Sequence, residues 1–193
     1  HGKKMSKSKG NVIAPSDIQE KYGTDALRMG LIVNNAPSTD MNLDPDKVNA
    51  YKKFANKLWN ISRFVIEATH TYDSSLTEAS GAEDLAITNR LNEVTKEITG
   101  YLEKYQYHLA SEKIYHYVWH EFADKIIEES KPILSGSDTG AVKSRQYVLL
   151  TILTTSLKLL HPFMPFVTEA IWQNLPKNVH KDERDILMIA KWP

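Results

Sequence analysis

The 193-residue sequence predicts an all-α protein, an antiparallel helix bundle preceded by a flexible loop and short connector helices. Apolar residues recur at steps of three and four through several long stretches, which is the spacing of one helix face. Runs that alternate apolar and polar residues are almost absent, and only Ile186–Trp192 fits a terminal strand or an extended tail. Clusters of Gly, Ser and Pro separate the periodic stretches and predict the turns between helices.

A loop and two short helices are predicted at the start. His1–Asn11 is basic, contains Gly and Ser and has no apolar period, so we expect a mobile loop. Pro15–Tyr22 predicts a short helix, because proline is tolerated in a first turn and Gly23 can end the helix. Thr24–Asn34 predicts a second helix with Thr24 as its N-cap, and Asn35–Leu43 is expected to be a loop.

The clearest helix start lies at Asp44. This side chain can accept from unpaired backbone N–H groups as the N-cap, Pro45 suits the first helical position, and Asp46 faces the positive end of the helix dipole. We expect the helix to run to about Ala68 and Trp59, which neighbours its apolar stripe, to lie in the core. The stripe consists of Val48, Tyr51, Ala55, Leu58, Ser62 and Val65.

Further helices complete the predicted bundle after a polar loop at Glu67–Asp84. The loop Lys131–Gly140, rich in Pro, Gly and Ser, is expected to divide them. Ala141–Leu160 is apolar nearly all round and so should be the central helix. The predicted helical stretches are Leu85–Tyr105, Leu109–Ser130, Ala141–Leu160 and Phe166–Leu175.

The balance of charge narrows the classes of function. Lys and Arg total 24 and Asp and Glu total 24, which excludes a uniformly basic nucleic-acid coat but not a local basic patch. Residues 1–63 carry 11 Lys and Arg against 6 Asp and Glu, so a polyanion is expected to meet the first third of the chain.

Other features of the composition exclude particular sites. Cysteine is absent, which excludes disulfides, thiolate zinc sites and a cysteine nucleophile and fits a reducing compartment. No apolar run reaches the roughly 18 residues that a membrane span needs, so we expect no membrane partner. Because His1-Gly2 is followed at once by lysines, we expect a fragment of a longer protein.

The most unusual run is Lys3–Asn11, with four lysines in seven positions and no acidic residue nearby. Four ammonium groups repel one another unless an anion sits among them, and Ser and Gly let the backbone move and donate to oxygen atoms. The run therefore suits a flexible clamp for phosphates. The alternative is a solvated basic tail or a patch of the nuclear-localisation kind.

The order of the residues in this run is specific. Lys4-Met5-Ser6-Lys7-Ser8 is identical to the signature loop of class I aminoacyl-tRNA synthetases, and the sequences of 9–13 and 21–28 continue the pattern of the enzymes for large aliphatic amino acids. Later segments resemble the valyl-tRNA synthetases in particular, so the resemblance covers essentially the whole chain. These segments are 36–44, 54–64, 120–124, 161–169 and Lys191-Trp192-Pro193.

The resemblance implies different roles for the two parts of the chain. Lys4 and Lys7 would be catalytic, holding ATP phosphates while valine is activated, and Met5, Ser6 and Ser8 would complete the ATP-binding loop. Residues 1–43 would be the signature loop and helical connector at the end of a catalytic region. Residues 44–193 would be an anticodon-binding helical bundle with a C-terminal tail. The partners implied are tRNA(Val), ATP with its Mg²⁺, and valine, in a cytoplasmic monomer that attaches valine to tRNA.

Some family features are missing from the sequence. Ala14 stands where the family usually has an Asp N-cap, which should cost about 1 kcal/mol of local helix stability. Lys125 stands where the family often has an aromatic residue. The second class I signature, His-Ile-Gly-His, is absent, as are a nucleotide-binding Gly-rich turn and an editing domain. We therefore expect these 193 residues alone not to activate valine.

The helix that begins at Asp44 carries the expected RNA contacts. Anticodon bases can be splayed, stacked on aromatic or guanidinium planes and read at their edges. The alternative is a solvated polar face with one partly exposed Phe. The predicted tRNA-binding residues are Lys53, Lys57, Asn60, Arg63 and Phe64, at helical steps, with Lys47 and Lys52 adding charge for phosphates.

Two further possibilities have less support. His116 and His120, with Glu112 one turn earlier, have the spacing of a metal pair but lack a further ligand, so no protein-bound metal is predicted. The second hypothesis for the whole chain is a helical protein-interaction module with a basic N-terminal tail and no RNA role. Salt dependence separates the two, because binding through phosphates weakens steeply as salt rises.

Overall fold

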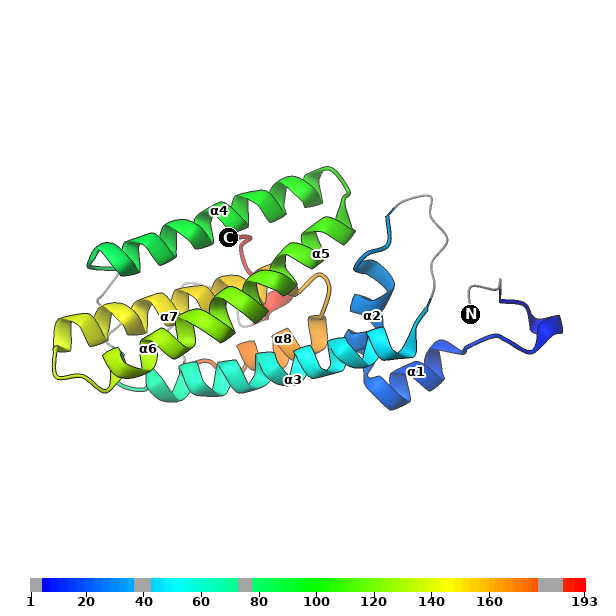
Figure 1. The fold of residues 1–193 in the computed structure, drawn as a ribbon, viewed down its shortest axis with the longest axis horizontal. Helices are drawn as coiled ribbons and strands as arrows, with labels where there is room; N and C mark the ends of the chain where they lie inside the picture. Colours follow the sequence, from blue (N-terminus) through cyan, green and yellow to red (C-terminus); the bar gives the residue numbers. More distant parts are fainter. Residues whose placement is uncertain (1–4, 37–42, 73–77, 177–185) are drawn as a thin grey trace.

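The computed structural model describes residues 5–36, 43–72, 78–176 and 186–193. The described residues are mostly helical and contain no strand, so the predicted fold class is confirmed (Figure 1). The α-helices are α1 (Pro15–Tyr22), α2 (Thr24–Ile32), α3 (Pro45–Ala68), α4 (Ala82–Glu103), α5 (Tyr107–His116), α6 (Ile127–Leu134), α7 (Thr139–Leu160) and α8 (Pro165–Trp172). Two 3₁₀ turns, η1 (Lys7–Lys9) and η3 (Leu187–Ile189), and a π-helical segment, η2 (Tyr117–Ile126), complete the elements.

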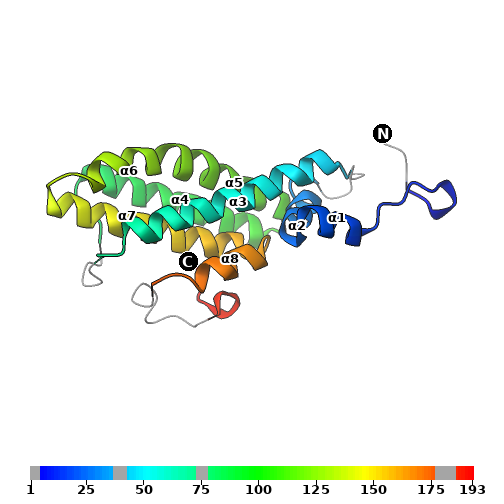
Figure 2. The same cartoon turned by 90° about the horizontal axis from the view of Figure 1, so that it is seen from below.

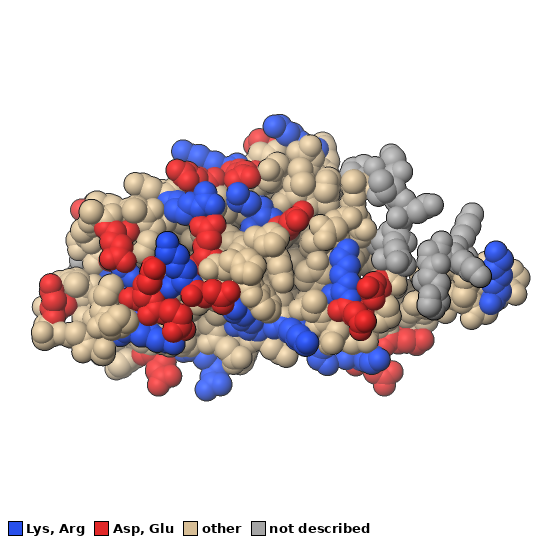
Figure 3. Space-filling view, in the orientation of Figure 1, with Lys and Arg blue, Asp and Glu red and all other residues tan. Residues whose placement is uncertain are grey.

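The long helices run side by side along an elongated body. In both cartoon views α3, α4, α7 and the rod formed by α5, η2 and α6 follow the long axis, and α1 and α2 lie at one end (Figures 1 and 2). The segment before α1 extends beyond that end. Figure 3 shows basic and acidic side chains interspersed over the visible face of the bundle.

Helix α7 is the centre of the core, as its sequence predicts. It packs against α3, α4, α5, α6 and α8. Most of its apolar side chains, from Val148 to Leu160, are buried, and the stripe of α3 from Val48 to Val65 packs against the same core. No helix among the described residues is both long and apolar enough to cross a membrane.

The predicted helix starts differ in their outcome. Asp44 caps α3 by accepting a hydrogen bond from the Asp46 N–H at 3.0 Å, which confirms that prediction. Ala14 provides no side-chain cap for α1, and its cost in helix stability stays a prediction. The prediction that Thr24 caps α2 is wrong, because Thr24 is already helical. Gly23, with a φ of +90°, supplies the sharp turn between α1 and α2.

The sequence prediction also fails at two other places, the end of the η2–α6 rod and Trp59, and one of its alternatives is excluded at the C-terminal segment. The helix predicted over Leu109–Ser130 is a longer rod that contains η2 and continues through Pro132 to Leu134. Of the two alternatives for Ile186–Trp192, the strand does not form, and the segment contains the turn η3 followed by a short extended tail. Trp59 is 40% exposed and not in the core, because it lies at the edge of the apolar stripe.

Candidate nucleic-acid interface

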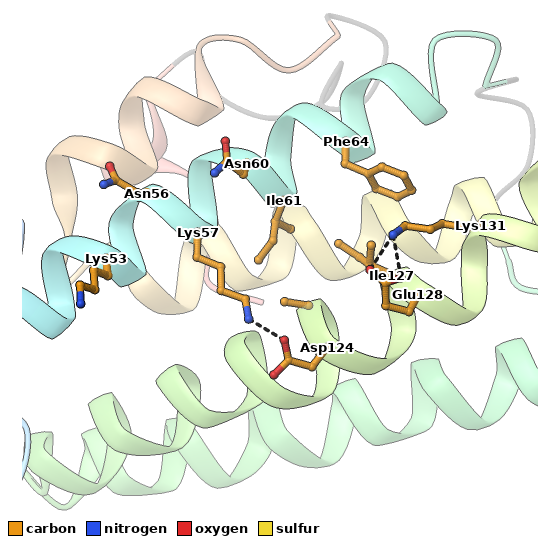
Figure 4. A pocket seen from close by; sticks show the side chains of 11 residues that line it. Lys53, Asn56, Lys57, Asn60, Ile61, Phe64, Asp124, Ile127, Glu128 and Lys131 are labelled. Atoms are coloured by element: carbon orange, nitrogen blue, oxygen red, sulfur yellow. Dashed lines mark hydrogen bonds and ion pairs between the residues drawn. The ribbon is translucent and has the colours of Figure 1, made fainter.

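An open groove of about 610 Å³ lies between α3 and the η2–α6 rod (Figure 4). One wall is a single face of α3, and the other comes from residues 123–131 of η2 and α6. The groove is lined by Lys53, Asn56, Lys57, Asn60, Ile61, Phe64, Ala123, Asp124, Ile127, Glu128 and Lys131.

The α3 wall contains four of the predicted tRNA-binding residues, Lys53, Lys57, Asn60 and Phe64. Steps of three, four and seven residues place them on one helix face. Lys53 and Asn60 are exposed, and Phe64 is half-buried, so its ring is accessible along one side. Lys53 lies towards one end of the groove and Phe64 towards the other, beside Lys131 (Figure 4).

Ion pairs cross and line the groove. Lys57 Nζ lies 2.5 Å from Asp124 Oδ1, and Lys131 Nζ lies 2.6 Å from Glu128 Oε2. The hydrogen bond from Lys57 holds the pKa of Asp124 below its ordinary 3.8. The Lys57 ammonium also lies 4.2 Å from the ring centroid of Trp119, within cation–π range. Lys57 must therefore exchange these partners before it can contact a phosphate.

The other predicted tRNA-binding residues lie outside the groove. Arg63 lines a separate pocket of about 260 Å³ between α3 and α8, beside Trp59. Lys47 Nζ donates to the Val33 carbonyl at 2.5 Å, and burial lowers its pKa from the ordinary 10.5. Lys52 Nζ donates to the Lys21 carbonyl at 2.9 Å. Lys47 and Lys52 thus hold α3 to the chain around α1 and α2.

Sequence reasoning missed part of the groove. Asn56 lies one turn before Asn60, so the helical spacing could have found it. Asp124, Glu128 and Lys131 could not be found in this way, because only the packing of the η2–α6 rod brings them opposite α3.

The two histidines next to the groove stack on each other. The rings of His116 and His120 have centroids 5.5 Å apart, and His120 Nδ1 lies 3.4 Å from Asp124 Oδ2. Within the described part of the chain, no cluster of three or more His, Asp or Glu side chains is placed to hold a metal ion.

The signature loop lies at the opposite end of the molecule, beyond α1 (Figure 1). The Ser6 N–H donates to Asn11 Oδ1 at 2.8 Å, and the Lys9 N–H donates to the Ser6 carbonyl at 3.1 Å. Gly10 adopts a φ of +62°, which favours glycine at the turn. The hydroxyls of Ser6 and Ser8 lie 2.6 Å apart. Lys4 and the side chain of Lys7 lie outside the described residues.

Comparisons with known proteins match both parts of the chain. Residues 84–193 match the family described as the anticodon-binding domain of tRNA ligase. Residues 1–44 match the class I tRNA synthetases for I, L, M and V.

Relatives match along the whole chain. The valine–tRNA ligases of Clostridium tetani and Thermotoga maritima are each 43% identical to it over its full length. The chain spans only 22% and 21% of those two proteins, or about a fifth of their length.

Solved structures share the fold. The LeuRS of Agrobacterium radiobacter K84, in a ternary complex with tRNA and LeuAMS, superposes with a TM-score of 0.78 at 20% identity; the match covers all of this chain and 22% of that one. The methionyl-tRNA synthetase of Mycobacterium tuberculosis, in complex with methionyl-adenylate, has a TM-score of 0.71 at 22% identity over 88% of this chain and 35% of its own. The match over more than half of the residues, on a helical bundle of the same fold, shows that the chain belongs to the family of anticodon-binding domains of tRNA ligases.

Proposed function

We propose that this chain is part of a valine–tRNA ligase, in which residues 44–193 bind the anticodon of tRNA(Val) and the loop at residues 4–8 binds the phosphates of ATP. The observation that carries the proposal is the groove on α3, which gathers Lys53, Lys57, Asn60 and Phe64 in a chain 40–43% identical to valine–tRNA ligases. A protein-interaction role without RNA has no support, because the matched family binds anticodons.

The groove suits single-stranded RNA. The partly accessible ring of Phe64 can stack on a splayed base, the amide of Asn60 can pair with a base edge, and Lys53 can neutralise a phosphate. Lys57 would join them once a phosphate displaces Asp124. The proposal includes, as secondary tRNA-binding residues, Arg63, Lys47 and Lys52. They are secondary because their side chains lie away from the groove.

The signature loop fits a phosphate ligand. Residues 5–11 present two hydroxyls and contain no carboxylate. In the complete enzyme Lys4 and Lys7 would neutralise the charge that gathers on the leaving pyrophosphate as the valine carboxylate attacks ATP, and Met5, Ser6 and Ser8 would shape the loop. Mg²⁺ would accompany the nucleotide. Residues 1–43 would thus end the catalytic region, and the enzyme would act as a cytoplasmic monomer.

Electrophoretic shifts with tRNA(Val) and with the same tRNA carrying a changed anticodon test the RNA-binding part. We expect preference for the first, and Phe64→Ala and Lys53→Gln should each weaken binding. Tyr105→Ala and Lys96→Gln are matched controls, because these exposed side chains of the α4 region lie outside the groove. Equal binding of both tRNAs would contradict anticodon recognition.

Valine-dependent exchange of pyrophosphate into ATP tests the catalytic part. We expect the complete protein to catalyse it, Lys7→Ala to reduce it strongly, and the 193 residues alone, which lack His-Ile-Gly-His, to show none. Full activity of Lys7→Ala would remove this lysine from the site.

A further inference from the structure

Two segments of the chain that resemble synthetases lie against each other in the structure. Neither of them lines the groove or belongs to the signature loop. One is residues 21–28, which end in α2, and the other is residues 161–169, which contain the turn between α7 and α8. More than 130 residues separate them in the chain, yet side chains of α2 make four hydrogen bonds to the backbone of the second segment.

Asp25 caps α8 from outside that helix. Its Oδ2 accepts from the Val167 N–H at 2.7 Å, and its Oδ1 accepts from the Phe166 N–H at 3.2 Å. These are the first-turn N–H groups that an N-cap side chain normally satisfies, and Met164, at the N-cap position of α8, provides no such bond. Asp25 is buried, which raises its pKa, while the two N–H groups oppose the rise.

Arg28, one turn after Asp25, holds the other side of the same turn. Its Nη2 donates to the Pro162 carbonyl at 2.8 Å and its Nε donates to the Phe163 carbonyl at 3.2 Å. These carbonyls directly follow α7, where a cation also interacts favourably with the negative end of the helix dipole. Asp25 therefore accepts from backbone N–H groups at the start of α8, and Arg28 donates to backbone carbonyls just after the end of α7.

The joint formed by Asp25, Arg28 and residues 162–167 lies between the two proposed sites. Helix α2 packs on α1, which follows the signature loop, and α8 and α7 pack on α3, which carries the groove. Gly30 of α2 lies so close to α3 that a Cβ there would be 2.9 Å from Val48 Cγ2. The joint is thus one of the contacts through which the loop end of the molecule is fixed to the RNA-binding helix.

We infer that Asp25 and Arg28 are positioning residues for the charging reaction, because they fix the connector behind the signature loop to the α7–α8 turn of the RNA-binding bundle. The inference rests on the proposed function. Neither residue lies in the groove or in the signature loop. Their loss should therefore change how a bound tRNA is presented to the catalytic region and leave its binding to the bundle intact.

The test compares Arg28→Met, Arg28→Lys and Asp25→Asn with wild type in the complete protein. Asp17→Asn, which changes an exposed carboxylate of α1, is the control. The measurements are the Kd for tRNA(Val), the kcat and KM of charging, valine-dependent pyrophosphate exchange without tRNA, and the melting temperature. Misplacement of reacting groups by about 1 Å can cost about 100-fold in rate.

We expect Arg28→Met to lower the kcat of charging by about 10-fold or more, while Kd and pyrophosphate exchange change by less than about 3-fold. Arg28→Lys, which keeps a charged donor, should recover most of the rate, and Asp25→Asn should resemble Arg28→Met more than the control. Unchanged charging by the folded Arg28→Met variant overturns the inference, and so does a parallel fall in kcat, tRNA binding and exchange. Failure of wild type itself to charge tRNA(Val) would instead refute the proposed function.

Discussion

Arg145 in α7 donates a 2.7 Å hydrogen bond from Nε to Oδ1 of Asp84 at the start of α4, and the Arg145 side chain is only 1% exposed. Ser144 donates to the second carboxylate oxygen of Asp84 at 2.5 Å, and Arg145 Nη1 donates to Ser130 Oγ at 3.2 Å. Glu83 Oε1 lies 3.1 Å from Arg145 Nη2. This buried network joins α4, α6 and α7 with most of its polar atoms satisfied.

Breaking this pair from one side should destabilise the bundle strongly. Arg145→Met leaves the Asp84 carboxylate buried without its cation, for which we expect a loss of about 3–5 kcal/mol in the free energy of unfolding. Urea unfolding measures it. Lys131→Met, which breaks an exposed pair with Glu128, is the control and should cost at most about 1 kcal/mol. Adding Asp84→Asn should recover part of the loss, and equal losses in Arg145→Met and the control would contradict the prediction.

Gly30→Ala should loosen the contact between α2 and α3. The new Cβ would lie 2.9 Å from Val48 Cγ2, and such overpacking costs about 1–3 kcal/mol. Thermal unfolding of Gly30→Ala measures the effect. Gly100→Ala in α4 is the matched control, because its Cβ meets open space and alanine is the better helix former there. Val48→Ala should relieve the clash in the double variant. A melting temperature for Gly30→Ala at or above that of Gly100→Ala would show that the contact is not tight.

Acid should destabilise the protein through His161. Its Nδ1 lies 2.8 Å from Thr168 Oγ1, its Nε2 is buried without a hydrogen-bond partner among the described residues, and burial lowers its pKa from the ordinary 6.5. The nearby charges have opposing effects on the pKa of His161, since Arg28 lowers it while Glu169 and Asp25 raise it. A histidine whose pKa is lower in the folded than in the unfolded state contributes to the free energy of unfolding. This contribution is fully present above pH 6.5 and is lost as the pH falls through the folded-state pKa.

The stability difference between wild type and His161→Gln isolates this effect from the other histidines. Wild type should lose more stability than the variant between pH 7.5 and pH 5.5, measured by urea unfolding. Parallel pH profiles for the two proteins would show that His161 does not titrate differently on folding.

Asp124→Asn should strengthen RNA binding in the groove. The change removes the carboxylate that pairs with Lys57, so the ammonium becomes available to a phosphate. One additional phosphate contact should steepen the dependence of log K on log salt by about 0.7. Titrations of tRNA(Val) at several salt concentrations measure it, with Glu103→Gln, an exposed carboxylate at the end of α4, as the control. Weaker binding by Asp124→Asn would mean that the carboxylate itself contributes to the RNA site.

Local signals in the sequence were sufficient for much of the fold. Asp44, Pro45 and the stripe from Val48 to Val65 predicted α3 with its cap, because capping and helical periodicity depend only on neighbouring residues. The continuation of α6 past Pro132 is not predicted from the sequence, because an interior proline loses its N–H and its ring crowds the carbonyl four residues earlier, which favours a helix end. The π-helical segment was also missed, since its apolar pattern fits an ordinary helix.

Only part of the candidate site could be predicted from local patterns in the sequence. Lys53, Lys57, Asn60 and Phe64 shared a face that helical spacing could predict. Helical spacing could not show that Lys47 and Lys52 lie outside the groove. They have the charge to bind phosphate, but their ammonium groups donate to the carbonyls of Val33 and Lys21. Contacts between segments distant in the chain, including those of Asp124 and Asp25, require the tertiary structure.

The π-helical segment η2 has a consequence for comparing this chain with others. Bonding from residue i to i+5 winds the backbone more loosely than an α-helix, so side chains after Ile126 are rotated out of phase with those before Tyr117. One extra residue in a π turn is matched by winding that is lower by about one residue step, roughly 100°. Deleting one residue here, with a return to α-helical winding, would therefore leave Ile127, Glu128 and Lys131 facing α3. Homologues that lack one residue in this stretch and have an ordinary α-helix there should therefore still present the side chains that align with residues 127–131 to α3.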